Sequence, residues 1–385
     1  MRGDLLPSQR LGDDPLAQRV EEMRARAAWS RIRYFTPHQR FKAARETRSL
    51  RTAEVARVVL IEAFSATRNE PKQAEEWASF GIQLLEILST REVAGDQRRE
   101  RLGEAYTILG NARRVGHDYQ GAAAAIQTAY GHLENNPTAH LADLCSIHAS
   151  LKDAIGDLEG AVWLIERGLE IYTALRNRHG VGRLKVQHAN ILRETQPTEA
   201  RVIAADAILV LPRAEVRLEM LARCIISQSF AETRDGKAAL TQLEETRPLI
   251  SQFREAWLDC RVQFLEALIL ETLGYIADAE RLYREVARLF WLREMYRESF
   301  MVRLRLFEFY LRRNRVQEAA EVCSKAVRLL GETDAHAQMK EVWQRLYEAA
   351  EAQAIKIEMC PKIRDYMVRH WAVPAERLPG FAAID

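Results

Sequence analysis

Glycine and proline are scarce in this chain, with 18 and 11 residues among 385. Their combined share is below the usual ~12%, which argues against a turn-rich sandwich or barrel and favours long helices joined by short turns. Long apolar runs are also missing. The longest candidate, residues 202–211, contains Asp206 and is far shorter than the ~18–20 residues of a membrane span. We therefore expect no membrane partner.

Cysteine is both rare and dispersed. The five cysteines are odd in number and form no Cys-x-x-Cys pair, which predicts neither a disulfide framework nor a structural zinc site. The first residues also lack the apolar core of a secretory signal peptide. We therefore expect a cytoplasmic protein. The cysteines are Cys145, Cys224, Cys260, Cys323 and Cys360.

Motifs for catalysis are missing as well. The nearest match to a phosphate-binding loop, Gly180-Val181-Gly182, has no strand before it. The nine histidines form no His-Glu-x-x-His set, and His148 and His188 fit satisfied side chains in a helix–helix seam better than metal ligands. We expect no catalytic residue, no metal ligand and no cofactor, and hence a protein that is not an enzyme.

An internal repeat is the main positive feature. Residues 106–130 contain Leu109-Gly110-Asn111-Ala112, then a turn from Gly116 to Asp118, then Ala122, Ile126 and Ala129. An Ala-x-x-x-large-x-x-Ala spacing places all three side chains on one helical face. Small residues on that face let two antiparallel helices approach closely, while the large residues fill the space between them.

The position of Ala122 recurs along the chain. Successive copies lie 39 or 40 residues apart, and a looser copy precedes Ala122 by 48 residues, with the excess in the polar stretch 89–101. Repeats at such a period indicate stacked supersecondary units that bury a continuous core between neighbours. The seven anchor positions are Ala74, Ala122, Ala161, Ala200, Ala239, Ala279 and Ala319.

The Leu-Gly-Asn-Ala helix and the alanine-anchored helix that follows it resemble a tetratricopeptide repeat (TPR). The resemblance implies an all-α fold, a right-handed α-solenoid of about seven TPR-like helical hairpins with helical caps. The repeat exceeds the common length of 34 residues, and such long units resemble the sensory and scaffold halves of bacterial regulators. No helix-turn-helix or zinc-binding head precedes the repeats here, so a regulatory adaptor is favoured over direct action on transcription.

The repeat also predicts how the chain is organised. We expect a flexible tail over residues 1–15 and basic N-terminal capping helices over 16–50. The TPR-like solenoid then covers 51–330, and C-terminal capping helices and a tail cover 331–385. Within the last segment we expect a helix from Ala335 to Glu358 and another from Lys362 to Trp371. Terminal units of a solenoid need a polar outer face, which these atypical ends supply.

The resemblance also implies where a partner binds. First helices of such repeats line an inner concave groove that takes a peptide or a partner helix. In the best-matched repeat the groove positions are Thr107, Asn111 and Arg114. An Asn after Leu-Gly commonly grips a ligand backbone in peptide-binding members, although Asn111 also fits a solvated residue or a local cap.

The same offsets can be counted through the later repeats. The positions so obtained are polar in the early repeats and more apolar in the later ones, which fits either an amphipathic partner or a frame that slips toward the core. We take the polar positions as groove candidates. They are Ser146, Ser150, Lys185, Gln228 and Glu308, and the apolar ones include Cys224, Phe264 and Leu268.

Charge is concentrated at the N-terminus. The formal net charge is +2, but residues 19–57 carry ten Arg and one Lys against four Glu, so the rest of the chain is acidic. The arginines suit contacts with phosphates or with an acidic protein partner, and bases or partner side chains could stack on the interleaved aromatic rings. The alternative is an amphipathic capping helix that packs through Trp29, Ile32 and Phe35. The candidate basic patch comprises Arg24, Arg31, Arg33, Arg40, Arg45 and Arg48.

Two functions therefore stay open. The first is a non-enzymatic protein- or peptide-binding scaffold or regulatory adaptor that uses the concave groove of a TPR superhelix. The alternative is a nucleic-acid-associated transcriptional regulator that contacts DNA or RNA through residues 19–57. The sequence specifies neither the identity of the partner nor the oligomeric state.

Overall fold

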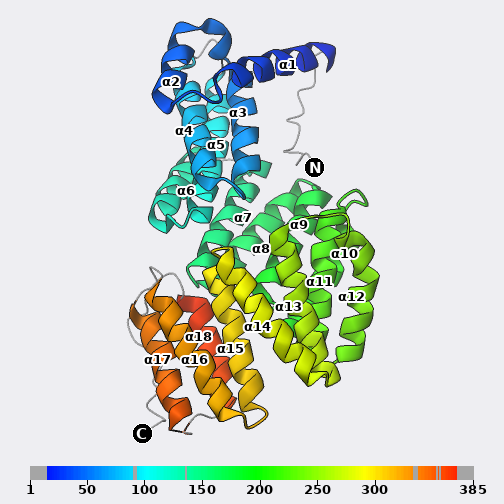
Figure 1. The fold of residues 1–385 in the computed structure, drawn as a ribbon. Helices are drawn as coiled ribbons and strands as arrows, with labels where there is room; N and C mark the ends of the chain where they lie inside the picture. Colours follow the sequence, from blue (N-terminus) through cyan, green and yellow to red (C-terminus); the bar gives the residue numbers. More distant parts are fainter. Residues whose placement is uncertain are drawn as a thin grey trace. The chain divides into compact units, whose positions relative to one another are not determined.

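The structure is a computed structural model, and it describes residues 15–89, 93–134, 137–332, 337–352, 354 and 357–370. These residues form α-helices and two short 3-10 helices, and they include no β-strand (Figure 1). The all-α class predicted from the sequence is confirmed. The chain divides into two compact units between Leu151 and Lys152, inside helix α7.

The first unit begins with capping helices that cover the first hairpin. Helix α1 packs on α3, and α2 packs on α4. The Trp29 Nε1 donates a hydrogen bond to Glu62 Oε2 at 3.0 Å, and the Trp29 ring lies against Trp77 and Phe80. The helices are α1 (Pro15–Ile32), α2 (Pro37–Glu46), η1 (Arg48–Leu50), α3 (Ala53–Ala66), α4 (Pro71–Ile87), α5 (Gly95–Val115), α6 (Tyr119–Leu133) and α7 (Ala139–Ala154).

The second unit continues the same pattern of paired helices. The pairs α9–α10, α11–α12, α13–α14 and α15–α16 each pack together. The helices are α8 (Leu158–Ala174), α9 (Arg178–Leu192), α10 (Pro197–Val210), α11 (Val216–Glu232), α12 (Gly236–Ile250), α13 (Ala256–Leu273), α14 (Ile276–Leu292), α15 (Tyr296–Leu311), α16 (Val316–Gly331), α17 (Ala337–Glu351), η2 (Ile357–Met359) and α18 (Cys360–His370).

The seven alanine anchors behave as the repeat predicts. Each one is the fourth residue of a second helix, α4 to α16, and its N–H donates to the carbonyl of the residue four positions earlier. All seven have 0% relative exposure. No larger side chain fits there without moving the facing first helix, because protein interiors are close-packed. The helical hairpins from α3 to α16 confirm the predicted α-solenoid class of seven TPR-like repeats.

Most of the tight turns within hairpins are made without glycine, which agrees with the low glycine content of the chain. The chain leaves α5, α11 and α15 through His117, Arg234 and Asn314, which have φ of 66°, 67° and 56°. Among the described residues, the glycines with positive φ are Gly156 and Gly274. A residue with positive φ ends a helix and redirects the chain, so the second helix of each hairpin can return along the first.

Some element boundaries differ from the sequence prediction. Helix α17 ends at Glu351, so the predicted helix to Glu358 is shorter, and a 3-10 turn precedes α18. Helix α5 has 21 residues, more than any other described helix, and contributes to the longer spacing before Ala122. The predicted tail before residue 15 and the chain after 370 lie outside the described residues. Among the helices of the described chain, none is long and apolar enough to cross a membrane.

Candidate functional site

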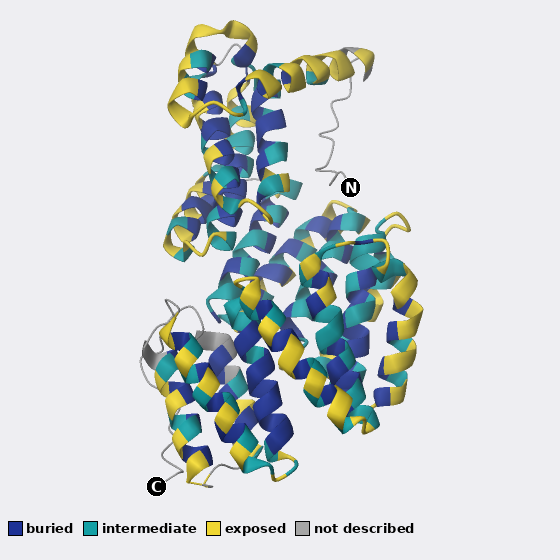
Figure 2. Ribbon diagram, viewed as in Figure 1, coloured by how far each residue is buried: buried dark blue, intermediate teal, exposed yellow. Residues whose placement is uncertain are grey.

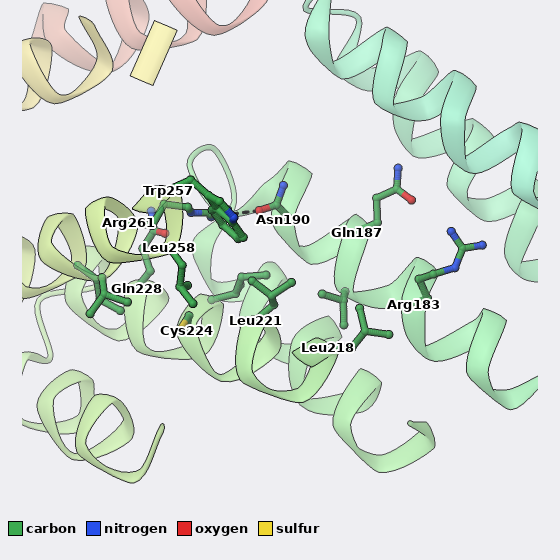
Figure 3. Close-up of a pocket in the computed structure, with 14 residues that line it drawn as sticks. Arg183, Gln187, Asn190, Leu218, Leu221, Cys224, Gln228, Trp257, Leu258 and Arg261 are labelled. Carbon is green, nitrogen blue, oxygen red and sulfur yellow. Dashed lines mark hydrogen bonds between the residues drawn. The ribbon is translucent and has the colours of Figure 1, made fainter. Parts of the chain in front are cut away.

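A pocket of about 290 Å³ opens on the first helices of three consecutive hairpins in the second unit. Its lining comes from α9, α11 and α13, and Figure 3 shows these side chains converging on one space. The lining residues are Arg183, Val186, Gln187 and Asn190 on α9; Leu218, Leu221, Cys224, Ile225 and Gln228 on α11; and Trp257, Leu258, Arg261, Val262 and Leu265 on α13.

Helix α11 forms the floor of the pocket. Leu218, Leu221, Ile225 and Gln228 are spaced by three or four residues, which places them on one helical face. The opposite face of α11 packs on its own second helix, α12, through Ser227, whose Oγ donates to Ala239 O at 2.7 Å. Helix α11 therefore turns one face to the core of its own hairpin and the other to the pocket.

Polar groups gather at one side of the pocket, around Asn190. The Asn190 Oδ1 accepts hydrogen bonds from Arg193 Nη1 at 2.6 Å and from Arg261 Nη2 at 3.2 Å. Arg193 also pairs with Glu194 at 2.9 Å. Residues from α9 and α13, far apart in sequence, thus form one cluster beside the apolar floor (Figure 3).

Burial and charge perturb the titration of this cluster. Desolvation, followed by the positive charge of Arg193, lowers the pKa of Arg261 to about 10. Desolvation opposes ionisation of Glu194, but the surrounding arginines Arg193, Arg297, Arg364 and Arg261 outweigh it and lower the pKa of Glu194. Arg261 and Glu194 are therefore both charged at neutral pH.

The pocket thiol is suited to packing and not to nucleophilic chemistry. Burial raises the pKa of Cys224 to about 11, so its reactive thiolate form is negligible at neutral pH. Its Sγ lies 4.0 Å from Met220 Sδ. In the described part of the chain, no group of three or more His, Cys, Asp or Glu side chains is arranged to hold a metal ion. An apolar floor with a few placed polar groups is the chemistry of a binding site.

Among the predicted groove residues of the second unit, Gln228 lines this pocket. Lys185 does not, because its Nζ lies 3.6 Å from Asp206 Oδ2 on α10. Glu308 on α15 is fully buried and is surrounded by arginines. The three groove positions predicted in this unit thus have different surroundings. Gln228 lies at the pocket, Lys185 lies against its own hairpin, and Glu308 lies in a charge cluster.

The groove residues predicted in the first unit are mostly buried. Thr107 donates to the carbonyl of Gly103 at 2.8 Å, one turn back. Arg114 Nη2 donates to Asn111 Oδ1 at 2.8 Å, and Asn111 is 8% exposed. Ser150 Oγ donates to the carbonyl of the buried Ser146 at 3.1 Å. The side-chain oxygen of Asn111 thus already accepts hydrogen bonds from a neighbouring side chain of the same helix.

The basic segment divides into structural and exposed arginines. Arg40 is buried, donates to the carbonyl of Phe35 and pairs with Glu76 at 3.0 Å. Arg33 is half-buried and lies 3.7 Å from Glu62. Helix α1 is exposed along most of its length (Figure 2). The exposed members of the patch are Arg24, Arg31, Arg45 and Arg48.

The sequence reasoning missed the residues that give the pocket its polar character, Asn190, Trp257 and Arg261. The offsets counted forward from α11 reached Phe264, but Phe264 packs against Tyr283 of α14 on the core side. The pocket face of α13 carries Arg261 and Leu265, which stand 40 positions after Leu221 and Ile225. Counting one repeat of 40 residues forward from Leu221 reaches Arg261.

Comparison with known proteins found similarity in structure but none in sequence families. No family model matches the sequence, and no curated protein matches it. The crystal structure of a Rap protein complexed with competence and sporulation factor is similar over 82% of this chain and 87% of that chain, with a TM-score of 0.63 and 15% identity. The crystal structure of yeast Tom70 aligns over 77% of this chain and 64% of that chain, with a TM-score of 0.43 and 14% identity. The chain is a TPR-like helical repeat protein.

Proposed function

We propose that the protein is a non-enzymatic binding scaffold that holds a peptide or a segment of a partner protein in the pocket on α9, α11 and α13. The supporting observation is that three successive first helices present an apolar floor with polar groups on one side. First helices of repeat proteins commonly form such binding surfaces. A Rap protein with the same fold is solved in complex with competence and sporulation factor, which agrees with a binding role.

Affinity in this scheme comes from a few apolar anchors. Burying one large aliphatic or aromatic side chain contributes about 1.5–3 kcal/mol. An engineered cavity of about 150 Å³ holds a benzene molecule, so a pocket of about 290 Å³ has room for two such groups. The polar side chains then fix the orientation of the bound segment.

The test is to fill the pocket. A library of random pentapeptides is selected on the purified full chain and on the Leu221→Trp variant. Leu221 lies on the pocket floor. The larger side chain of tryptophan should therefore reduce the enrichment of the selected peptides by about tenfold or more. The matched control is Leu240→Trp on the second helix α12, where Leu240 is 38% exposed. Equal enrichment on both variants, or none on the wild-type chain, contradicts the proposal.

We further propose that the protein works in a reducing compartment, the bacterial cytoplasm. The five cysteines are all free thiols, and four of them are buried, which supports a location where disulfides are not formed. Reaction of the unfolded chain with a thiol reagent after extraction from the host gives the test. Five reactive thiols per chain agree with the proposal, and fewer indicate oxidation in place.

The alternative function, nucleic-acid binding, is supported by fewer residues. Four arginines of the basic patch, Arg24, Arg31, Arg45 and Arg48, are exposed on the N-terminal caps. If they contact phosphates, DNA or RNA affinity should fall steeply with salt, with a slope set by the number of contacts. Changing all four to Gln should then flatten the slope. A flat response of the wild-type chain, or no binding at low salt, removes this alternative.

A further inference from the structure

Two guanidinium groups converge beside the pocket on one neutral oxygen. Arg193 at the end of α9 and Arg261 on α13 both donate to Asn190 Oδ1, at 2.6 and 3.2 Å. An amide oxygen accepts hydrogen bonds but carries no charge to neutralise them. The geometry therefore holds two like charges together at a fixed place on the pocket edge.

Only one of these two arginines has a carboxylate partner. Arg193 pairs with Glu194 at 2.9 Å. No carboxylate in the described part of the chain forms an ion pair with Arg261, whose contacts are Asn190 and the ring of Trp257, 5.9 Å from its Cζ. Desolvation and the charge of Arg193 lower the pKa of Arg261 to about 10, although Cys224, Glu194 and Glu298 act in the opposite direction. A carboxylate in direct contact with the guanidinium would stabilise its charged form further.

The Arg261 guanidinium, which forms no ion pair with a carboxylate in the described residues, stands beside apolar surface. Trp257 and Leu258 precede Arg261 on α13, and Leu221 lies on the pocket floor. A hydrogen bond between guanidinium and carboxylate is strongest where water is excluded and both nitrogens are presented. A ligand that fits both features has a carboxylate next to a large apolar side chain.

We propose that Arg261 is the anion-recognition residue of this pocket, and that the bound segment is a peptide whose carboxylate meets Arg261 while a neighbouring apolar side chain enters between Leu221 and Leu258. This inference rests on the proposed function. The shared chemistry is a carboxylate, which a peptide supplies either from its C-terminus or from an Asp or Glu side chain. Asn190 acts as a positioning residue that holds Arg261 in place.

The experiment uses three pentapeptide libraries that each contain one fixed Leu. The first has free C-termini and no Asp or Glu, the second has amidated C-termini and one Asp or Glu, and the third is amidated and has no carboxylate. Binding to the purified full chain is measured by peptide enrichment. We expect at least one carboxylate library to bind about tenfold more tightly than the neutral one. The library that wins identifies the source of the carboxylate.

Variants at Arg261 separate charge from shape. Arg261→Gln should remove the preference for carboxylates and keep weak binding of neutral apolar peptides. Arg261→Lys keeps the charge but not the paired nitrogens, so it should retain part of the preference and shows that the site still folds. The matched control is Arg288→Gln, at an exposed arginine on α14, which should change nothing.

Glu194 provides a variant with the opposite effect. Its carboxylate already lies among the same arginines, so Glu194→Gln removes an internal competitor and should strengthen the preference for carboxylates. A wild-type chain that binds neutral and carboxylate libraries equally overturns the inference but leaves the proposed function standing. The same holds if Arg261→Gln keeps the full preference. Absence of binding to all three libraries overturns both.

Discussion

Arg364 of helix α18 donates to both carboxylate oxygens of Glu308 on α15, at 2.6 and 2.5 Å. Arg305 of α15 and Arg312, which caps the end of that helix, approach the same carboxylate at 3.2 Å each. Glu308 has no exposed surface. One buried carboxylate thus holds three guanidinium groups and fastens the last helix to the solenoid.

Removing that carboxylate should destabilise the second unit strongly. Glu308→Gln removes the buried carboxylate that Arg305, Arg312 and Arg364 share, and breaking one side of a buried ion pair costs about 3–5 kcal/mol. Urea unfolding followed by circular dichroism measures the change. The control is Glu341→Gln, which breaks the surface pair with Arg345 and should cost less than about 0.5 kcal/mol. Equal effects of the two changes would contradict the structural role of Glu308.

The alanine anchors should tolerate no larger side chain. Ala200 is fully buried in α10 against its first helix, α9, so Ala200→Leu should destabilise the chain by about 1–3 kcal/mol through overpacking. Ala205 lies on the same helix and is exposed. Ala205→Leu should change the free energy of unfolding by less than about 0.5 kcal/mol. Similar losses at both positions would show that Ala200 is not an anchor.

Stability should also depend on pH through His188. Burial lowers the pKa of His188 below its usual 6.5, although Glu166 and Glu199 act in the opposite direction. The unfolded chain then takes up this proton more readily than the folded chain, so stability falls as the pH drops through about 6.5 and below. Carboxylates titrate at lower pH, near about 4, so they do not obscure this range.

The comparison is urea unfolding at about pH 7.5 and about pH 5.5. The wild-type chain should be less stable at the lower pH, and His188→Gln should reduce the difference. The same change at the exposed His38 should leave the difference as it is. His132, whose pKa burial and Arg99 also lower, accounts for the part that remains.

The fold could be predicted because the sequence pattern that defines a hairpin is short and recurs along the chain. A small residue must stand at each crossing of two helices, so the spacing from Ala74 to Ala319 revealed every hairpin from the sequence. The boundaries at the C-terminus were harder, since α17 and α18 lie beyond the repeat and have no earlier copy with which to compare.

The pocket could be predicted only in part because its residues come from different repeats. Gln228 was reached by counting offsets, but the same count in α13 gave Phe264 and Leu268, whereas the lining residues Arg261 and Leu265 stand three positions earlier. Glu308 occupies a groove offset and serves instead as a buried counter-charge. The convergence of Arg193 and Arg261 on Asn190 depends on how helices pack, which no local pattern records.

Hydrogen–deuterium exchange of the full chain, with and without a peptide selected from the pentapeptide library, tests the central claim most directly. Binding in the pocket predicts slower exchange in segments 183–190, 218–228 and 257–265, which carry the lining residues, and little change in α10, α12 and α14. Protection confined to the N-terminal caps α1 and α2, or to the second helices, would contradict a binding site on α9, α11 and α13.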